Sequence, residues 1–430
     1  MVSAVRWRRR LPWLGLGVLG ACLVGIVLLN LWPHTRGLQQ RLGHVSAVES
    51  VQFRREMGAL LGTGVSTGNA VQDFQNGAEI FPAMLASIHA ARHSINLETY
   101  IYWSGNVSKE FVAALTERAR AGVKVRVLAD WVGSTRMKQE VVDALRAGGV
   151  RFEYFHPLSW YAIDRVNNRT HRKLMVVDGK VAFNGGVGIA DAWDGDGTQP
   201  DHWRDMQFRV EGPAAAQMQA IFGSNWLATT GEVLLGPDYY PDIPAGGDLD
   251  AQAYASSPQG GSQNMQLMYL MAINGARRSI DLECAYFVPD ELTLTALRDA
   301  LARGVRVRLV VPGPHVDSAV VRDASQAQWG PMLQAGARMY RYQPSLFHNK
   351  LMVVDGYLTI AGSANFDNRS FQLNDESNIA IYDHAFAAHM IGVIERDIGR
   401  SHELTLPQWR ARPWRQRATD WLSSTMSAQL

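Results

Sequence analysis

The stretch FHNKLMVVDGYLTIAGSANFDNRS, residues 347–370, has a close counterpart in THRKLMVVDGKVAFNGGVG, residues 170–188. In each, a histidine and a lysine two residues apart precede an aliphatic run, an Asp-Gly pair and a second aliphatic run. Asp-Gly between two such runs is typical of a tight hairpin turn. Because alternate residues of a strand share a face, the histidine and lysine of each copy are predicted to project to the same side.

Three further pairs of segments repeat in the same order along the chain. HSINLETYIYW (93–103) returns as RSIDLECAYFV (278–288), RARAGVKVRVLAD (118–130) as ALARGVRVRLVV (300–311), and LRAGGVRFEYF (145–155) as LQAGARMYRYQ (333–343). Four pairs in one order predict two copies of a single structural unit.

Each repeat alternates helical and strand patterns. Helices are expected over 80–92 and 109–121 and again over 265–278 and 292–303, with β-rich runs between and after them. This alternation predicts an α/β fold in which each repeat forms a β-sheet flanked by helices. The expected divisions are an N-terminal membrane anchor (1–33), a membrane-proximal segment (34–68), a first domain (69–236), a linker rich in Pro, Gly, Ser and Asp (237–264), and a second domain with a basic and aromatic C-terminal segment (265–430).

The N-terminus has the pattern of an uncleaved membrane anchor. Four arginines lie within residues 1–10, and Leu11 to Trp32 contain no charge. A helix of that length spans about 33 Å, enough for a hydrocarbon core. The run Leu19 to Cys22 resembles a lipoprotein processing box, but the apolar stretch continues well past the cysteine. The arginines ahead of the span predict a cytoplasmic N-terminus with the catalytic part outside.

Composition limits the classes of partner and cofactor. The net charge is +2, so nothing in the balance calls for a nucleic acid. The two cysteines, Cys22 and Cys284, provide neither a disulfide framework nor a zinc cluster.

The duplicated motif gives the chain its chemical signal. A single H-x-K-x4-D pattern is weak, because it arises by accident in roughly one such chain in twenty. Two copies in matching contexts, each followed by Gly185-Gly186 or Gly362-Ser363, favour a functional site. Turn preference alone explains Asp178 and Asp355 as hairpin residues.

These residues resemble the phospholipase D superfamily, whose signature H-x-K-x4-D-x6-G-[GS]-x-N is present twice. The chain looks most similar to bacterial cardiolipin synthases, on NFDNRSFQLNDES (365–377), HWRDMQFRVEGPA (202–214), YFVPDEL (286–292) and WRARPW near the C-terminus. The resemblance runs from about residue 69 to the end, and its motifs specify the superfamily better than the substrate. It implies two repeats packed with pseudo-two-fold symmetry around one active site.

The resemblance also implies a mechanism in which no metal is required. One histidine attacks phosphorus to form a phosphohistidine while the other protonates the leaving alcohol and then activates the incoming hydroxyl. By analogy His171 is the nucleophile and His348 the acid and base, although the near-symmetric repeats leave that assignment open. The resemblance places the remaining site residues as follows: Lys173, Lys350, Asp178 and Asp355 with the catalytic histidines, and Asn365, Ser363 and Gly186 at the substrate.

Each histidine needs an acceptor for its second ring nitrogen. The resemblance suggests Asp205 for His171 and Glu376 for His348, each about 30 residues beyond its histidine, while surface ion pairs are the alternative. Glu98 and Glu283, in matching strands, either face the cleft or are buried beside an arginine.

The first motif departs from the signature, because Gly188 stands where the second motif has Asn365. Losing such a donor typically costs about 2.7 to 4 kcal/mol in a transition state. Either a backbone N–H or neighbouring side chain replaces it, or the glycine makes room for a bulky lipid head group.

The function that this pattern favours is phosphatidyl transfer at a bacterial inner membrane, making cardiolipin from two phosphatidylglycerols. Transfer to another alcohol such as ethanolamine, hydrolysis by a phospholipase D, a nuclease and a non-catalytic lipid-binding protein are the alternatives. Tryptophans and arginines interleaved in PQWRARPWRQRATDWL suit an anionic membrane interface, unless the terminal helix packs its tryptophans on the domain. The oligomeric state cannot be read from the sequence.

Overall fold

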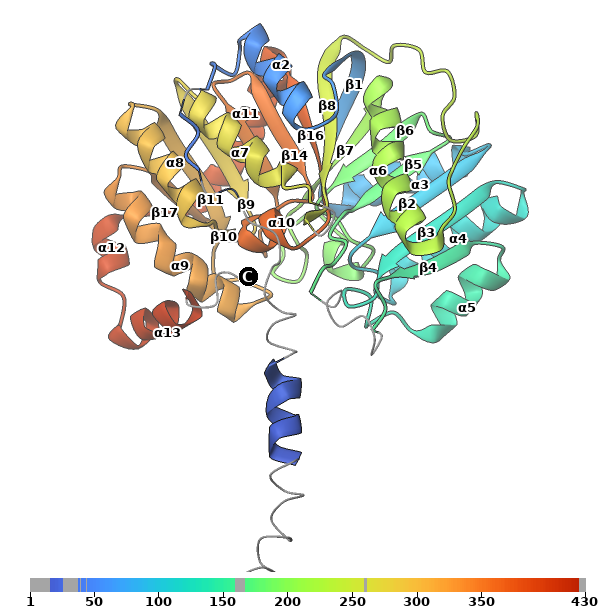
Figure 1. Ribbon diagram of the computed structural model, residues 1–430, viewed down its shortest axis with the longest axis horizontal. Helices are drawn as coiled ribbons and strands as arrows, with labels where there is room; N and C mark the ends of the chain where they lie inside the picture. Colours follow the sequence, from blue (N-terminus) through green and yellow to red (C-terminus); the bar gives the residue numbers. More distant parts are fainter. Residues whose placement is uncertain are drawn as a thin grey trace, which may run out of the picture.

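The fold is described by a computed structural model over residues 16–25, 38, 40–43, 45–158, 167–258 and 261–424. Two lobes of mixed α/β structure lie side by side, and each corresponds to one sequence repeat (Figure 1). The predicted α/β class is therefore confirmed.

One hydrogen-bonded sheet of 15 strands runs through both lobes. Its order is β17-β12-β11-β9-β13-β14-β16-β8-β1-β7-β6-β5-β2-β3-β4, so the equivalent strands follow in the same order outwards from the β8/β1 junction. In the first half the strands are β1 (Ser66–Gln75), β2 (Ser94–Thr99), β3 (Lys124–Asp130), β4 (Arg151–Phe155), β5 (Leu174–Val177), β6 (Val181–Gly185) and β7 (Met206–Glu211). In the second half they are β8 (Leu249–Ser256), β9 (Ser279–Cys284), β11 (Arg306–Pro312), β12 (Arg338–Tyr342), β13 (Lys350–Val354), β14 (Leu358–Gly362), β16 (Glu376–Tyr382) and β17 (Ser401–Leu404). A separate parallel pair joins β10 (Phe287–Val288) to β15 (Phe366–Asp367).

The junction between the halves lies in the segment for which the sequence predicts a linker. Strand β8 falls within residues 237–264 and pairs antiparallel with both β16 and β1. The pairing with β1 includes Ser66 opposite Ala251 and Asn69 opposite Leu249. The expected pair of separate sheets is therefore a single sheet, because each half contributes its first strand to the junction.

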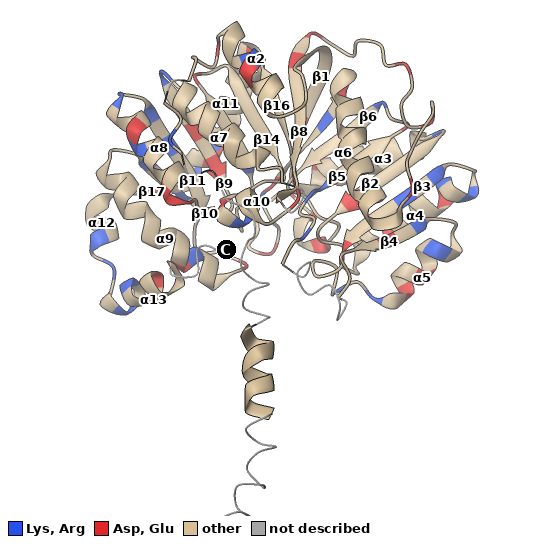
Figure 2. Ribbon diagram, viewed as in Figure 1, with Lys and Arg blue, Asp and Glu red and all other residues tan. Residues whose placement is uncertain are grey.

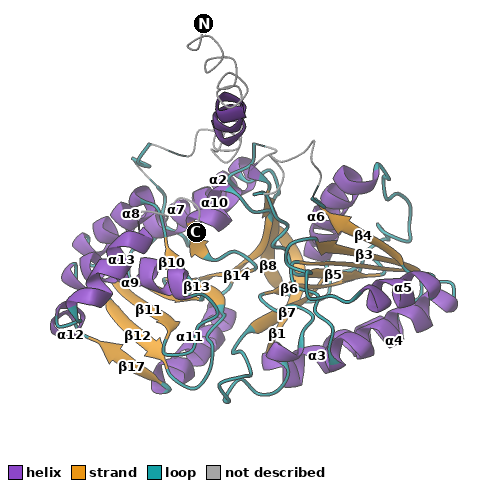
Figure 3. Ribbon diagram, turned by 90° about the horizontal axis from the view of Figure 1, so that it is seen from below, coloured by secondary structure: helices purple, strands orange, loops and turns teal. Residues whose placement is uncertain are grey.

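Helices cover both faces of the sheet (Figure 3). Helix α6 packs across strands of the first half and β8, and α11 packs across β9 and β11 to β14. The helices of the first half are α3 (Asn76–Ala90), α4 (Asn106–Arg120), α5 (Gln139–Ala147) and α6 (Pro213–Thr230). Those of the second half are α7 (Asn264–Gly275), α8 (Glu291–Ala302), α9 (Ala319–Gln334), α10 (Asn368–Gln372), α11 (His384–Gly399), α12 (Leu406–Arg410) and α13 (Trp414–Ser424).

Local sequence signals explain where several helices begin and end. Helix α6 starts with Pro213 in its first turn and ends at Gly231, whose φ of 73° few other residues adopt without strain. Asp290 and Asp383 cap α8 and α11 by accepting hydrogen bonds from the backbone N–H groups of Thr293 and Phe386.

The N-terminal region is described only in part. Residues 16–25 are helical, whereas residues 1–15 and 26–33 of the predicted anchor lie outside the described residues. Among the helices that the structure describes, none is long and apolar enough to cross a membrane. In the segment predicted to be membrane-proximal, α2 (Val51–Leu60) buries Phe53 and Met57 in the core of the second half.

Candidate active site

The two motif histidines lie immediately ahead of equivalent hairpins. His171 precedes β5, and His348 precedes β13. The His171 backbone N–H donates to the Asp375 carbonyl at 2.8 Å, and the His348 N–H donates to the Arg204 carbonyl at 2.8 Å. Each motif is therefore hydrogen-bonded to a segment of the opposite half.

These backbone hydrogen bonds between the halves place each histidine beside a carboxylate of the other repeat. His171 Nδ1 lies 2.9 Å from Glu376 Oε1, and His348 Nδ1 lies 2.6 Å from Asp205 Oδ2. The acids foreseen from the sequence are thus present beside the histidines. The expectation that each acid serves the histidine preceding it in the chain is wrong, because the backbone bridges place residues 375 and 204 beside the opposite motif.

The paired histidines, together with hydrogen bonds, hold the pKa values of both carboxylates low despite their burial. Glu376 accepts from the hydroxyls of Ser363 at 2.5 Å and Ser370 at 2.8 Å, and Asp205 accepts from Trp193 Nε1–H at 2.8 Å. Burial alone would raise the pKa of Glu376, but His171 and these donors lower it to about 2. The pKa of Asp205 is likewise lowered, against the effect of burial, by His348.

The same environment holds the histidines neutral. Burial lowers the pKa of His171 to about 4, although Glu376 opposes the shift. Burial and the nearby Lys350 lower the pKa of His348, with Asp205 opposing. Because an ionised carboxylate can only accept, Nδ1–H of each ring donates to its acid and Nε2 retains a lone pair.

The two motif lysines are buried beside the histidines. Lys173 Nζ donates to the His171 carbonyl at 2.7 Å, and Lys350 Nζ donates to the His348 carbonyl at 2.6 Å. Burial lowers the pKa of Lys173 to about 7, and it lowers the pKa of Lys350 as well. An anion entering between the lysines would favour their charged forms.

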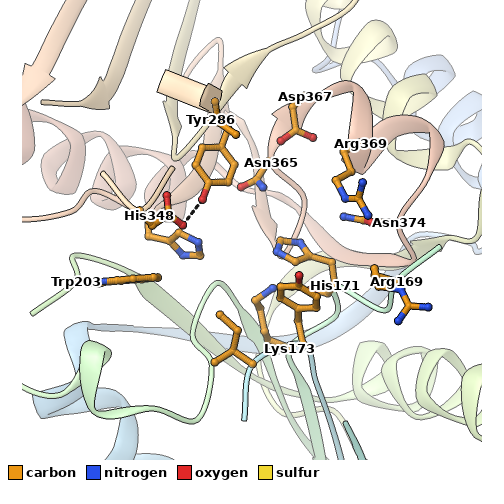
Figure 4. A pocket seen from close by; sticks show the side chains of 14 residues that line it. Arg169, His171, Lys173, Trp203, Tyr286, His348, Asn365, Asp367, Arg369 and Asn374 are labelled. Atoms are coloured by element: carbon orange, nitrogen blue, oxygen red, sulfur yellow. Dashed lines mark hydrogen bonds between the residues drawn. The ribbon is translucent and has the colours of Figure 1, made fainter. Parts of the chain in front are cut away.

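Both histidines and Lys173 face one cavity of about 340 Å³ whose two ends differ (Figure 4). Arg169, Arg369, Asn374 and Asp367 line the side near His171, whereas Trp203 and Tyr286 line the end near His348, and Asp317 also lines the cavity. The Tyr286 hydroxyl donates to the Asp317 carboxylate. One end therefore has two arginines, of which Arg169 lies 3.6 Å from the buried Asp130, and the other combines aromatic rings with a carboxylate.

Equivalent positions of the two repeats account for this difference. Trp203 and Asn374 each lie two residues ahead of the acid of their own half. Arg169 lies two residues ahead of His171, where the second motif has Leu346. None of these end residues is predicted singly from the sequence, and the signal that could have found Arg169 is its difference from Leu346 when the repeats are compared position by position. Among the described residues, no group of three or more His, Cys, Asp or Glu side chains could hold a metal ion.

Comparison with known proteins gives the family. A family model described as cardiolipin synthase, PLD-like domain, matches residues 84–226 and 269–398. The chain belongs to this phospholipase D-like family. It is 36% identical over 369 residues to a cardiolipin synthase of Geobacillus kaustophilus, covering 85% of this chain and 73% of that protein. It is 36% identical over 340 residues to cardiolipin synthase A of Pseudomonas putida, covering 78% and 70%.

A solved structure supports the fold of this phospholipase D-like chain. The phosphatidylserine synthase of Haemophilus influenzae superposes with a TM-score of 0.63 over 88% of this chain and 100% of that chain, at 13% identity. Family membership confirms the resemblance read from the two motifs and makes the protein a phosphatidyltransferase of the phospholipase D superfamily.

Two of the three residues expected at the substrate instead support the acids. Ser363 donates its hydroxyl to Glu376, and a Cβ on Gly186 would lie 2.1 Å from Asp205 Oδ1. Gly186 is therefore needed for the close approach of Asp205. Asn365 does line the cavity, and its buried Oδ1 has no hydrogen-bond partner.

Gly188 does not open room for a lipid head group. A Cβ at this position would lie 2.9 Å from Ile101 Cβ and 3.1 Å from the Trp193 ring. Trp193 is fully buried and holds Asp205, so the space of the missing side chain is already filled. The head-group hypothesis for this glycine is therefore wrong.

The motif aspartates lie at the far end of their hairpins from the histidines. Asp178 accepts hydrogen bonds from the backbone N–H groups of residues 92–94 at 2.7–2.9 Å, and Asp355 does the same for residues 277–279. Asp178 lies five residue steps beyond Lys173 along extended chain, about 16 Å. The prediction that groups these aspartates with the catalytic residues is therefore wrong. Both have φ above 50° in the hairpin turn, and their carboxylates hold that turn against the start of a neighbouring strand.

Glu98 and Glu283 are buried away from the cavity. Glu98 accepts from the Thr170 hydroxyl and lies 3.9 Å from Arg172, and Glu283 accepts from Asn349. Of the two readings that the sequence left open, burial beside an arginine describes Glu98, and neither carboxylate lines the cavity.

Proposed function

We propose that the protein is a membrane-anchored phosphatidyltransferase that makes cardiolipin from two phosphatidylglycerol molecules, releases glycerol and forms a phosphohistidine intermediate. The observation that supports this most strongly is the pair His171 and His348, each hydrogen-bonded to a buried carboxylate of the opposite half and both facing one cavity. Relatives named cardiolipin synthase support the choice of lipid.

In the first half-reaction His171 Nε2 attacks the phosphorus of one phosphatidylglycerol. The N–P bond forms as the bond from phosphorus to the glycerol oxygen breaks, and His348 gives its Nε2 proton to that oxygen. The pKa of His171, lowered to about 4, supports this assignment because the nucleophile must be neutral. The negative charge of the bound phosphodiester would raise the pKa of His348 and so supply the protonated acid.

In the second half-reaction neutral His348 removes the proton from a hydroxyl of a second phosphatidylglycerol. That oxygen attacks the phosphohistidine, the N–P bond breaks, and His171 returns to its neutral form. Lys173 uses one N–H on the His171 carbonyl, so two donors remain for the phosphoryl oxygens; Lys350 uses one on the His348 carbonyl and a second faces the His348 ring at 3.0–3.3 Å, so one remains. Asn365 supplies a further amide from the cavity wall.

The two ends of the cavity suit different parts of the substrate. Arg169 and Arg369 add positive charge on the His171 side, which favours an anionic phosphatidyl group. Asp317 and Tyr286 on the His348 side can bind the hydroxyls of a departing or entering glycerol. This arrangement supports His348 as the histidine next to the alcohol.

A second candidate is transfer to an amino alcohol such as ethanolamine. Asp317, with the rings of Trp203 and Tyr286 beside it, forms a surface that also attracts an ammonium group. Hydrolysis would follow if water replaced the alcohol. Phosphatidylglycerol is favoured over ethanolamine as the acceptor by Arg169 and Arg369, because their charges attract a second anionic lipid to the cavity.

Location at the bacterial inner membrane is part of the proposal. The uncharged run Leu11 to Trp32 would be the single span, and the arginines before it would keep the N-terminus in the cytoplasm. The catalytic lobes would then lie on the extracytoplasmic side.

The test is to incubate the purified full chain in mixed micelles with phosphatidylglycerol, with and without ethanolamine, and to identify products by mass. We expect cardiolipin and free glycerol in equal amounts, and neither from His171→Ala. Phosphatidylethanolamine as the main product would replace the first candidate with the second. Cleavage of labelled DNA with lipid untouched would exclude both.

A further inference from the structure

The C-terminal helices α12 and α13 lie against α9 on the outer side of the second lobe (Figures 1 and 3). Trp409 fixes this segment: its Nε1–H donates to the Gln326 carbonyl at 2.8 Å, and a Cβ on Gly330 would lie 2.3 Å from its ring. Of the three tryptophans in the segment, this one packs on the domain.

Helix α13 turns its polar residues inward and its apolar residues outward. Gln416 donates to the Gln326 side chain at 2.6 Å, and Asp420 is 1% exposed and paired with Arg412 at 2.8 Å. In contrast, Trp414 is 73% exposed and Trp421 is 68% exposed. A helix on a globular domain ordinarily has the opposite arrangement.

The exposed apolar residues form a continuous stripe. Trp414, Ala418, Trp421 and Leu422 are spaced four, three and one residues apart, which places them along one face of a helix, and all four are exposed. The helix therefore exposes an apolar face and packs its polar face on the domain.

The exposed charges of α12, α13 and the turn between them all have one sign. Arg410, Arg415 and Arg417 are exposed, and the acid of the segment, Asp420, is buried against Arg412 (Figure 2). Tryptophan with arginine is the composition that enters the head-group region of an anionic bilayer. A protein partner would need an equally acidic and apolar surface, whereas anionic phospholipid provides both at once.

We infer that α13 is a membrane-docking helix that inserts its tryptophan stripe into the interface of a bilayer containing anionic phospholipid. The inference concerns a surface outside the active site and holds whether or not the protein makes cardiolipin. Helix α9 connects the two places, since Val321 lines the cavity and Gln326, about 8 Å further along the helix, holds the docking segment. Docking would therefore position the wall of the cavity next to the lipid surface.

The test uses the full chain with Cys22→Ser and a single new cysteine, Ala418→Cys, labelled with an environment-sensitive fluorophore. Cys284 is buried and does not compete for label. The matched control is Ala388→Cys, an exposed alanine in α11. With phosphatidylglycerol vesicles we expect a blue shift and quenching by acyl-chain spin labels at 418, and neither at 388.

Charge is tested separately with R415Q/R417Q, labelled at 418. Each arginine near an anionic surface contributes about 1 kcal/mol, so the docking equilibrium constant should fall about 30-fold, and added salt should weaken docking of the parent chain. R55Q/R120Q, two exposed arginines elsewhere, is the control and should dock normally.

No response at 418 to phosphatidylglycerol vesicles would overturn the inference, as would an equal response to phosphatidylcholine vesicles. A blue shift that depends on protein concentration without vesicles would also overturn it, in favour of a contact between two copies. Activity in micelles does not enter these readouts, so failure of the docking inference and failure of the proposed function are distinguishable.

Discussion

Replacing Glu376 by glutamine should slow the formation of the phosphohistidine at His171. Both carboxylate oxygens lie within 2.9–3.1 Å of Nδ1 in a buried site, so the change removes a charge-assisted hydrogen bond worth about 1.5 to 3 kcal/mol. At 1.36 kcal/mol for each tenfold change, the step should slow roughly 10- to 150-fold. The hydroxyls of Ser363 and Ser370 can rotate to accept from the new amide, so the fold should tolerate the substitution.

The assay compares phosphatidylglycerol with a phosphatidyl ester of p-nitrophenol in single turnover. A p-nitrophenolate leaves without a proton, so Asp205→Asn, which disturbs the acid His348, should form the intermediate from this ester at nearly the parent rate. Glu376→Gln should remain slow with both substrates, because the nucleophile is still required.

If the activated ester rescued Glu376→Gln and left Asp205→Asn slow, the roles assigned to His171 as nucleophile and His348 as acid would be refuted. These roles rest on the crossed pairs, His171 with Glu376 and His348 with Asp205, each of which joins the two halves. The matched control is Glu117→Gln, which removes the carboxylate of a histidine pair at a similar distance, 2.8 Å from His89, on the exposed surface. Its turnover should equal that of the parent chain.

Three further changes test other parts of the site. Asp178→Ala removes an acceptor of three backbone hydrogen bonds and should lower the free energy of unfolding by about 2 kcal/mol in denaturant titrations; a large loss of turnover per folded molecule would contradict its structural role. Gly188→Asn must displace Ile101 or Trp193, so we expect a loss of about 1 to 3 kcal/mol in stability and no gain in turnover, and a gain would show that a missing donor limits the enzyme. Because the pKa of His171 is lowered, its neutral form persists until the pH falls through about 4, and kcat/KM should therefore not fall between pH 6.5 and 4.5, where protonation of the acid His348 only increases. An acidic limb near 6.5 would contradict this.

The doubled motif allowed much of the fold to be predicted from the sequence. Period-two alternation in VKVRVLAD and VRVRLVVP corresponds to β3 and β11, and the Asp-Gly pairs form the expected turns with two positive φ angles each. Strand β8 escaped prediction for a physical reason. Its inward residues include Ala251 and Ala253, which have weak strand preference, and Gly- and Pro-rich sequence precedes it.

The residues of the candidate site could be predicted from the sequence, but the pairing of each acid with its histidine could not. The histidines, lysines and acids are all present, but two near-identical repeats leave each acid equally matched to either histidine. Only the backbone bridges at Thr170 and Arg204 decide between the two arrangements. The contacts of Gly186 and Gly188 are likewise set by residues distant in the chain, so spacing alone could not assign their roles.

The crossed pairing of histidines and acids also has a consequence for the chain during its synthesis. During synthesis the first half emerges with His171 but without Glu376, which belongs to a segment still to be made. A nascent or proteolytically clipped half would have a histidine with no acid to hold its tautomer and no second lysine for the phosphate. If His171 is the nucleophile that we propose, its ring is held by its acid only once both halves have folded against each other.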